Sequence, residues 1–184
     1  AETLRSEGYT GPVTILSADR TLPCDRPNLS KDYLAGKAPD EWTVLRSAGF
    51  YEAHTIDVRL NSRVVRIDTS NRSVELETGE RLGYGALLLP TGAEPVRLDT
   101  PGADGAHVHY LRTLEDSRAL IASAQASRAA VIIGASFIGL EVASSLRARG
   151  IDVHVVGPEA VPMERVLGAE LGSFLRSVHE KNGV

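Results

Sequence analysis

The sequence predicts an α/β fold with parallel sheets and an inserted antiparallel β-meander. Strand-like runs alternate with helical segments in both halves of the chain, the pattern typical of parallel sheets. A glycine turn at residues 134–139 joins a strand to a helix, and a second strand follows that helix. Apolar and polar residues alternate in segments 56–60, 63–68 and 73–77, which indicates the meander.

Composition narrows the class of protein. The chain has 184 residues, of which 42% are hydrophobic, so a packed core is expected. The net charge is −4 and no basic patch stands out, so we do not expect nucleic acid as a partner. No apolar stretch has membrane-spanning length and no signal pattern is present, so a cytoplasmic protein without membrane contact is expected. Cys24 has no second cysteine to pair with, and the histidines show no metal-ligand spacing, so no metal site is expected.

The first half begins with a helical pattern that ends near Gly8. Two prolines, Pro23 and Pro27, predict a loop over residues 19–29. Ser30 is expected to cap the short helix that follows. The predicted elements are helices over residues 1–7, 30–34 and 47–54, strands over 13–17 and 56–60, and meander strands over 63–68 and 73–77.

An apolar run at residues 86–90 predicts a buried strand that ends in a tight turn at Thr91 and Gly92. Residues 95–105 hold two prolines and several small turn residues, which indicates a connection between domains. Thr113 and Asp116 form a capping pattern for the next helix. The later elements are helices over residues 113–125, 136–149 and 167–181, and strands over 129–133 and 152–156.

The glycine turn is the strongest local motif. Gly134 permits a tight turn after the strand, and Gly139 lets the helix pack closely on that strand. Ser136 occupies the middle position, where a glycine is usual, and its hydroxyl could donate to a phosphate. Together with Ser136, the amides of Phe137 and Ile138 at the helix N-terminus predict a site for a dinucleotide diphosphate. A βαβ turn that binds nothing is the alternative.

An acidic residue usually ends the second strand of such a motif and holds the adenosine ribose. Here that position is Gly157, and Glu159 follows two residues later. The nearest basic side chain is Arg165. The choice between NADH and NADPH therefore stays open, with Glu159 favouring NADH.

Four segments give the chain a resemblance to the FAD- and NAD(P)H-dependent pyridine-nucleotide oxidoreductases. The resemblance is to the branch of ferredoxin and rubredoxin reductases that also includes apoptosis-inducing-factor-like proteins. The segments are LPCDRPNLSK at 22–31, LLLPTGAEP at 87–95, YLRTLED at 110–116 and GASFIGLE at 134–141. The resemblance implies partial FAD-binding and partial NAD(P)-binding Rossmann-like domains, over residues 1–108 and 109–184, with the meander inserted.

The resemblance also assigns site residues. Lys31 would reach the flavin and Glu141 would be its acidic partner, and these two are the catalytic candidates. The other residues implied to contact FAD are Asp19, Arg26, Val64, Thr91 and Gly92. The glycine turn and Glu159 would hold NAD(P)H. Taken alone, Arg26 and Lys31 could be ordinary surface charges.

The implied activity is electron transfer from NAD(P)H through FAD to an iron–sulfur carrier such as ferredoxin or rubredoxin. The absence of a cysteine pair near Cys24 argues against a disulfide substrate. Residues 1–5 look like a helix already under way, so we expect the chain to be part of a longer protein that carries the FAD glycine turn. The alternatives are a nucleotide-binding module or a signalling module without redox turnover. The oligomeric state stays open.

Overall fold

The computed structural model describes all residues from 1 to 184. The chain forms two compact units, and neither is continuous in sequence. The first unit comprises residues 1–24 and 44–93, and the second comprises residues 25–43 and 94–184. This division differs from the sequential one expected at residue 108, because residues 25–43 pack with the later half. No helix is long and apolar enough to cross a bilayer.

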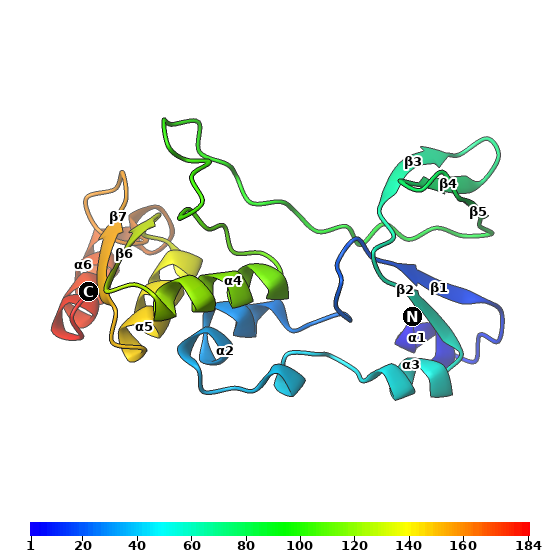
Figure 1. Cartoon of the computed structure of the whole chain (residues 1–184), viewed down its shortest axis with the longest axis horizontal. Coiled ribbons are helices and arrows are strands. Elements are labelled where there is room, and N and C mark those ends of the chain that lie inside the picture. The colour runs from blue at the N-terminus through cyan, green and yellow to red at the C-terminus, as the bar shows by residue number, and fades with distance from the viewer. The chain divides into compact units, whose positions relative to one another are not determined.

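The first unit contains a parallel strand pair and an antiparallel meander (Figure 1). The strand over residues 56–60, expected in the meander, pairs instead in parallel with the strand at 13–16. A third meander strand, not anticipated from the sequence, completes the second sheet. The elements are α1 (Glu2–Ser6), β1 (Val13–Leu16), α3 (Ala48–Ala53), β2 (Ile56–Arg59), β3 (Val64–Asp68), β4 (Ser73–Leu76) and β5 (Arg81–Gly83).

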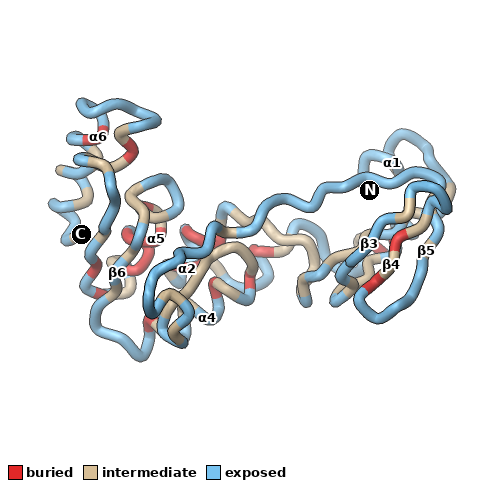
Figure 2. Tube along the Cα trace, turned by 90° about the horizontal axis from the view of Figure 1, so that it is seen from above, coloured by how far each residue is buried: buried red, intermediate tan, exposed pale blue.

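Arginine side chains join the parts of the first unit. Arg5 of α1 donates to the carbonyls of His54 and Thr55, each at 2.7 Å, and so fixes α1 beside the end of α3. Arg59 of β2 makes a bidentate contact with Glu80, at 2.9 and 2.6 Å, which ties the parallel pair to the meander. Val74 and Leu76 of β4 are buried. Figure 2 shows that buried positions are few along this unit.

The prediction of a buried strand at residues 86–90 is wrong. These residues form no strand, and Leu88 is 80% exposed. A strand needs a neighbour that accepts its backbone hydrogen bonds, and no strand of the chain pairs with this segment. The run is apolar, as a buried strand would be, but the sequence alone does not show whether a partner strand is available.

The second unit is a parallel pair of strands packed with helices. Its elements are η1 (Arg26–Ser30), α2 (Asp32–Ala35), η2 (Asp40–Trp42), α4 (Leu114–Gln125), β6 (Ala129–Ile133), α5 (Phe137–Ala148), β7 (Asp152–Val156) and α6 (Glu164–Lys181). Thr113 and Asp116 form the expected capping box of α4, with Thr113 N donating to Asp116 at 2.7 Å. The last helix begins three residues earlier than expected and is interrupted at Gly168, whose φ of 80° is non-helical.

Residues 25–34 depart from the expected loop and capped helix. Pro27 occupies the first turn of the 3-10 helix η1, where a missing N–H costs nothing. Ser30 does not cap α2, because Lys31 holds the N-cap position without a side-chain capping bond. The Ser30 hydroxyl instead donates to Glu141 at 2.6 Å. A tertiary partner, invisible in a local pattern, decides its role.

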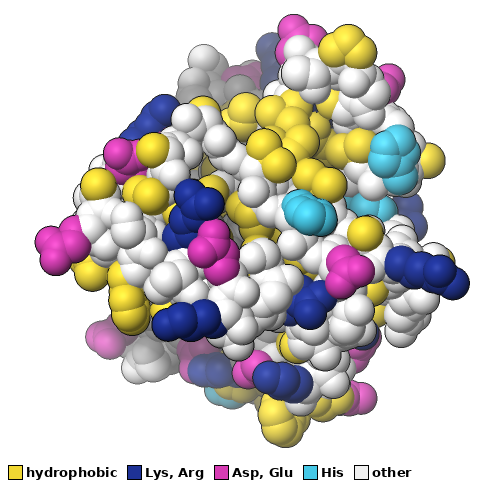
Figure 3. All heavy atoms as spheres, turned by 90° about the vertical axis from the view of Figure 1, so that its left-hand side faces the viewer, with side chains coloured by type: hydrophobic (Ala, Val, Ile, Leu, Met, Phe, Trp, Pro, Cys, Tyr) yellow, Lys and Arg dark blue, Asp and Glu magenta, His cyan; other side chains and the backbone are white.

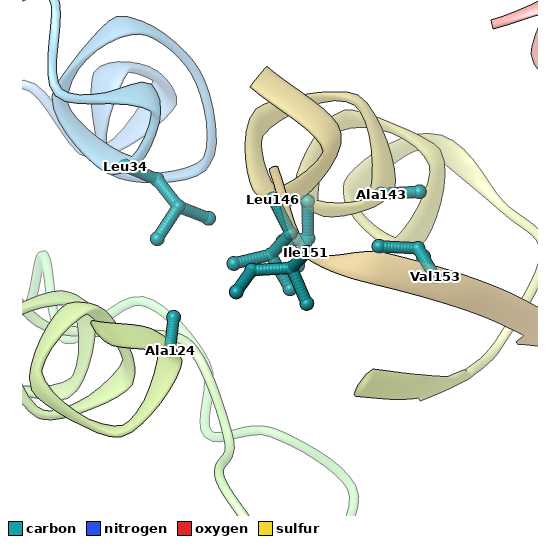
Figure 4. Close-up of a cluster of buried hydrophobic side chains, with 7 residues drawn as sticks. Leu34, Ala124, Ala143, Leu146, Ile151 and Val153 are labelled. Carbon is teal, nitrogen blue, oxygen red and sulfur yellow. The ribbon is translucent and has the colours of Figure 1, made fainter. Parts of the chain in front are cut away.

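The core of the second unit explains why residues 25–43 belong to it. Leu34 of α2 is fully buried and packs with Ala124 of α4 and with Leu146, Ile151 and Val153 of the βαβ segment (Figure 4). Burying a leucine side chain contributes roughly 1.5–3 kcal/mol. The segment is thus held by the core of a unit whose other residues lie at least 51 positions further along the chain.

Only one face of the β6–β7 pair packs against the core. Alternate residues of both strands point away from the core, and Val131, Ile133 and Val156 are exposed. Figure 3 shows hydrophobic side chains gathered at this end of the chain, among charged groups and histidines.

A polar cluster ties η2 to α2 and α4. Tyr33 donates to Asp40 at 2.8 Å, and Arg118 pairs with the other oxygen of Asp40. These two hydrogen bonds hold the pKa of Asp40 below its usual value, and burial raises the pKa of Tyr33.

We predict that Asp40→Asn destabilises the chain by about 0.5–1 kcal/mol at neutral pH, the range of exposed hydrogen bonds and ion pairs. Because the folded-state pKa of Asp40 is lowered, its contribution is present above the unfolded-state pKa and is lost as pH falls through the folded-state pKa. Urea unfolding at neutral and acid pH checks this. Glu41→Gln, one residue along η2, is the control and should change stability little. An equal deficit at both pH values would contradict the prediction.

Candidate nucleotide site

The glycine turn lies between two neighbouring parallel strands, as the sequence predicted. β6 leads into the turn, α5 follows it, and β7 pairs with β6 from Ala129 to Ile133. Gly134 extends the pairing, since its amide donates to the carbonyl of Val156 at 2.7 Å. Gly134 has a φ of 117°, a conformation that residues with a side chain rarely adopt.

Gly139 is fixed by close packing. A Cβ at this position would overlap the carbonyl oxygen of Gly134 and lie 3.5 Å from Ile132 Cγ2. The first turn of α5 can rest on the end of β6 only because that atom is missing. The role assigned to this glycine from the sequence, close packing of helix on strand, is confirmed.

The N-terminus of α5 presents unsatisfied amides. The first backbone bond of the helix runs from Leu140 N to Ser136 O at 3.0 Å, so the amides of Phe137, Ile138 and Gly139 have no acceptor within α5. Ser136 is the N-cap residue, and its hydroxyl makes no capping bond. Phe137 and Ile138 are exposed. Free amides and the positive end of the helix dipole suit an anion such as a diphosphate.

The end of β7 lies against the turn. A Cβ at Gly157 would stand 3.1 Å from Ala135 Cβ, and Glu159 Oε2 lies 3.5 Å from the same point. The Glu159 carboxylate therefore folds back toward the strand end, where an acidic residue was expected. Its other oxygen pairs with Arg165 Nε at 2.9 Å. The Arg165 side chain is 78% exposed, whereas that of Glu159 is 22% exposed.

Lys31 and Glu141 meet, as the sequence predicted for a shared site. Lys31 Nζ lies 3.1 Å from Glu141 Oε1, and Ser30 Oγ donates to Glu141 Oε2 at 2.6 Å. Glu141 is two residues beyond Gly139, so the helix that offers its N-terminus to an anion also carries the acidic partner of Lys31. Half of the Lys31 side chain is exposed, which leaves its charge accessible.

Arg26 lies in the same unit and reaches a residue not singled out from the sequence. Arg26 Nη1 contacts the carbonyl of Arg112 at 3.5 Å. The Arg112 amide donates to Asp116 at 3.0 Å, while its buried Nε has no hydrogen-bond partner. A second arginine therefore stands beside Arg26. The YLRTLED segment was the available signal, but its pattern did not distinguish Arg112 from a surface charge.

The remaining predicted residues lie in the first unit. Asp19 follows β1, and its carbonyl accepts from Asn61 N at 3.1 Å. Val64 begins β3 and pairs with Leu76. Thr91 and Gly92 are exposed and lie outside any strand. Their roles, like those of the other assigned residues, stay predictions. Within the chain no group of histidine, cysteine or acidic side chains is placed to hold a metal ion.

We predict that Gly139→Ala destabilises the chain by about 1–3 kcal/mol, because the added methyl group forces α5 away from β6. Thermal unfolding measures the loss. Gly49→Ala is the matched control, since that glycine lies in α3 with no atom near its Cβ position, and the substitution should be neutral or stabilising. Equal effects of the two substitutions would contradict the close packing described here.

Comparison with known proteins identifies the family. The pyridine nucleotide-disulphide oxidoreductase family matches residues 1–184. Rhodocoxin reductase of Rhodococcus erythropolis is 39% identical over 184 residues, which cover 100% of this chain and 43% of the relative. Biphenyl dioxygenase system ferredoxin–NAD(+) reductase component of Paraburkholderia xenovorans is 41% identical, and the match covers 100% of this chain and 45% of the relative.

A solved ferredoxin reductase for the CYP199A2 system of Rhodopseudomonas palustris superimposes with a TM-score of 0.93 at 36% identity, covering 100% of this chain and 45% of that chain. The chain thus spans less than half the length of these proteins. Rubredoxin reductase and apoptosis-inducing factor 3 are also among the relatives, so the branch indicated by the sequence is confirmed. The chain belongs to the pyridine nucleotide-disulphide oxidoreductase family.

Proposed function

We propose that the protein carrying this chain is a flavoprotein oxidoreductase that passes electrons from NAD(P)H through FAD to an iron–sulfur carrier. The observation that carries the proposal is the Lys31–Glu141 pair, which joins the implied flavin lysine to the helix of the glycine turn. Relatives named as reductases of ferredoxin and rubredoxin support the class of acceptor. A solved relative is a covalent putidaredoxin reductase–putidaredoxin complex. We place the protein in the cytoplasm, in keeping with its single cysteine.

The residues present suit both nucleotides. The first amides of α5, which have no acceptor within the helix, form a cradle for the NAD(P)H diphosphate, and the missing Cβ of Gly139 lets the helix begin close against β6. Arg26 and Arg112 supply positive charge, and the buried Arg112 Nε has no hydrogen-bond partner in the chain. It could therefore donate to a phosphate oxygen of FAD. In the first unit, Asp19, Val64, Thr91 and Gly92 are proposed as FAD contacts on the resemblance.

FAD and NAD(P)H, when bound, would supply hydride transfer and electron storage, and the chain would orient them and tune their charge. Lys31 would offer a cation to the electron-rich reduced flavin. The Lys31 ammonium lies 3.1 Å from Glu141 Oε1 and also donates to the carbonyl of Pro27 at 3.4 Å. No side chain needs to take up or release a proton for the hydride step.

Electron transfer is tested on the intact protein, purified and examined for flavin absorbance. NADH oxidation is then measured with ferricyanide and with a ferredoxin. We expect Lys31→Met to slow flavin reduction by about tenfold, equal to about 1.4 kcal/mol, because the reduced ring loses a nearby cation. Lys37→Met, an exposed lysine of the same segment, is the control and should leave the rate unchanged.

A colourless, inactive protein would overturn the proposed function. A yellow protein that forms a stable complex with reduced nicotinamide but passes electrons slowly would favour the signalling module instead.

We further propose that Glu159 and Arg165 set the nicotinamide preference together. Glu159 and Arg165 form an ion pair at 2.9 Å. The Glu159 carboxylate would accept from the ribose hydroxyls of NADH, and the exposed Arg165 guanidinium would pair with the 2′-phosphate of NADPH. The strand end itself carries no acid, since Gly157 occupies it. We therefore propose that NADH is preferred only moderately.

We predict that Arg165→Ala raises the KM for NADPH by about tenfold and leaves the KM for NADH nearly unchanged, the loss expected for one phosphate contact. Glu159→Gln should narrow the preference for NADH. Arg176→Ala is the matched control, since Arg176 pairs with Glu180 through the same nitrogen at 2.8 Å but lies further along α6. Parallel changes for both nucleotides would count against the pair as a selector.

A further inference from the structure

Side chains on one face of α5 bind the segment that contains Lys31. Glu141 and Ser145 of α5 and Arg149, its C-cap residue, follow one another at intervals of four residues, which places them on the same side of the helix. Glu141 contacts the side chains of Ser30 and Lys31. Arg149 Nε donates to the carbonyl of Leu34. Ser145, between them, contacts main-chain oxygens.

Ser145 holds the backbone of the same two residues whose side chains meet Glu141. Its hydroxyl lies 2.7 Å from the carbonyl oxygen of Ser30 and 3.1 Å from that of Lys31. The side chain is buried, with 5% of the residue exposed. Lys31 joins η1 to α2 with φ of −112° and ψ of −119°, which is neither helical nor extended. The position of the Lys31 Cα is therefore set by contacts with α5 together with the backbone bonds of Lys31 to Asn28 and Ala35.

We propose that Ser145 is a positioning residue that places the Lys31 ammonium relative to the flavin and so tunes the flavin potential. The proposal rests on the function proposed above, in which Lys31 faces FAD. Ser145 touches neither the cofactor nor the reacting atoms in this scheme. It acts through the main chain of Ser30 and Lys31, and Glu141 contacts the side chains of the same two residues. Residues of α5 thus help determine the position of the Lys31 ammonium.

Loss of the Ser145 hydroxyl has a defined consequence. The buried carbonyl of Ser30 loses its donor, while the carbonyl of Lys31 keeps the Ala35 amide at 2.8 Å. The turn at Ser30 and Lys31 then relaxes away from α5 so that the Ser30 carbonyl can find another donor. Lys31 is half exposed, so its ammonium gains freedom to move into solvent. The negative charge of the reduced flavin is then stabilised less, and the midpoint potential falls.

The test compares the potentials of FAD-loaded variants of the intact protein by spectroelectrochemistry. Ser145→Ala should weaken the reduction equilibrium about tenfold, which for a two-electron couple corresponds to about 30 mV toward negative potential. Ser145→Thr retains the hydroxyl and should restore the native potential. Ser117→Ala is the matched control, because Ser117 is also fully buried and its hydroxyl donates to a carbonyl of η1, that of Leu29, at 2.9 Å. It should lower thermal stability without moving the potential.

Lys31→Met separates the possible failures. If it shifts the potential and Ser145→Ala does not, or if Ser117→Ala shifts it as much as Ser145→Ala, the inference about Ser145 is overturned and the proposed function stands. If Lys31→Met leaves the potential unchanged, or the protein binds no flavin, the role of Lys31 fails and the inference fails with it.

Discussion

The contact of α5 with residues 29–34 is the interaction on which the second unit depends. On one side of α5, Val142 and Leu146 enter the core with Leu34, while Glu141 and Ser145 bind the polar atoms of Ser30 and Lys31. Because buried carbonyls and hydroxyls must find partners, this register between helix and segment is strongly specified. The same helix begins at the glycine turn, so the geometry of the nucleotide site and that of Lys31 are set by one rigid element.

The packing at Gly139 supplies the other end of that constraint. The first turn of α5 lies directly against the end of β6, because Gly139 has no Cβ to meet the carbonyl of Gly134. The amides of the first helical turn and the carboxylate of Glu141 are therefore fixed at a constant separation within one helix. A bound diphosphate at the N-terminus of α5 and a cation beside Glu141 would be held in register without the help of mobile loops.

Local patterns predicted the elements of the second unit well, because its strands, caps and glycines act through neighbours in sequence. The capping box at Thr113 and the turn from Gly134 to Gly139 involve residues at most five positions apart. The sequence could not reveal partners that arise only in three dimensions. Serine is a residue type that often caps helices, yet the Ser30 hydroxyl donates to Glu141, which is 111 residues away. The run at 86–90 has the composition of a buried strand but lacks a strand to pair with.

The candidate site was predicted to a similar extent. The pairing of Lys31 with Glu141 and the parallel strands around Gly134 followed from motif and resemblance, and the structure contains both. The contact of Arg112 with Arg26 and the ion pair of Glu159 with Arg165 were not predicted. No fixed spacing in the sequence indicates either contact. Neither Ser117 nor Ser145 has any motif, and each is recognised only by the carbonyl it faces.

The discontinuous make-up of the two units bears on how the chain assembles during synthesis. Residues 25–43 leave the ribosome more than 90 residues before α5, the helix that must receive them. α4 supplies part of the native cover, with Ala124 against Leu34 and the Ser117 hydroxyl on the carbonyl of Leu29, but the Ser30 carbonyl receives its donor only from α5. Residues 44–93, which belong to the first unit, separate the two segments in sequence. Contacts of such long sequence separation form slowly. Nascent chains that stop before α5 should therefore be more sensitive to protease at residues 25–43 than the whole chain.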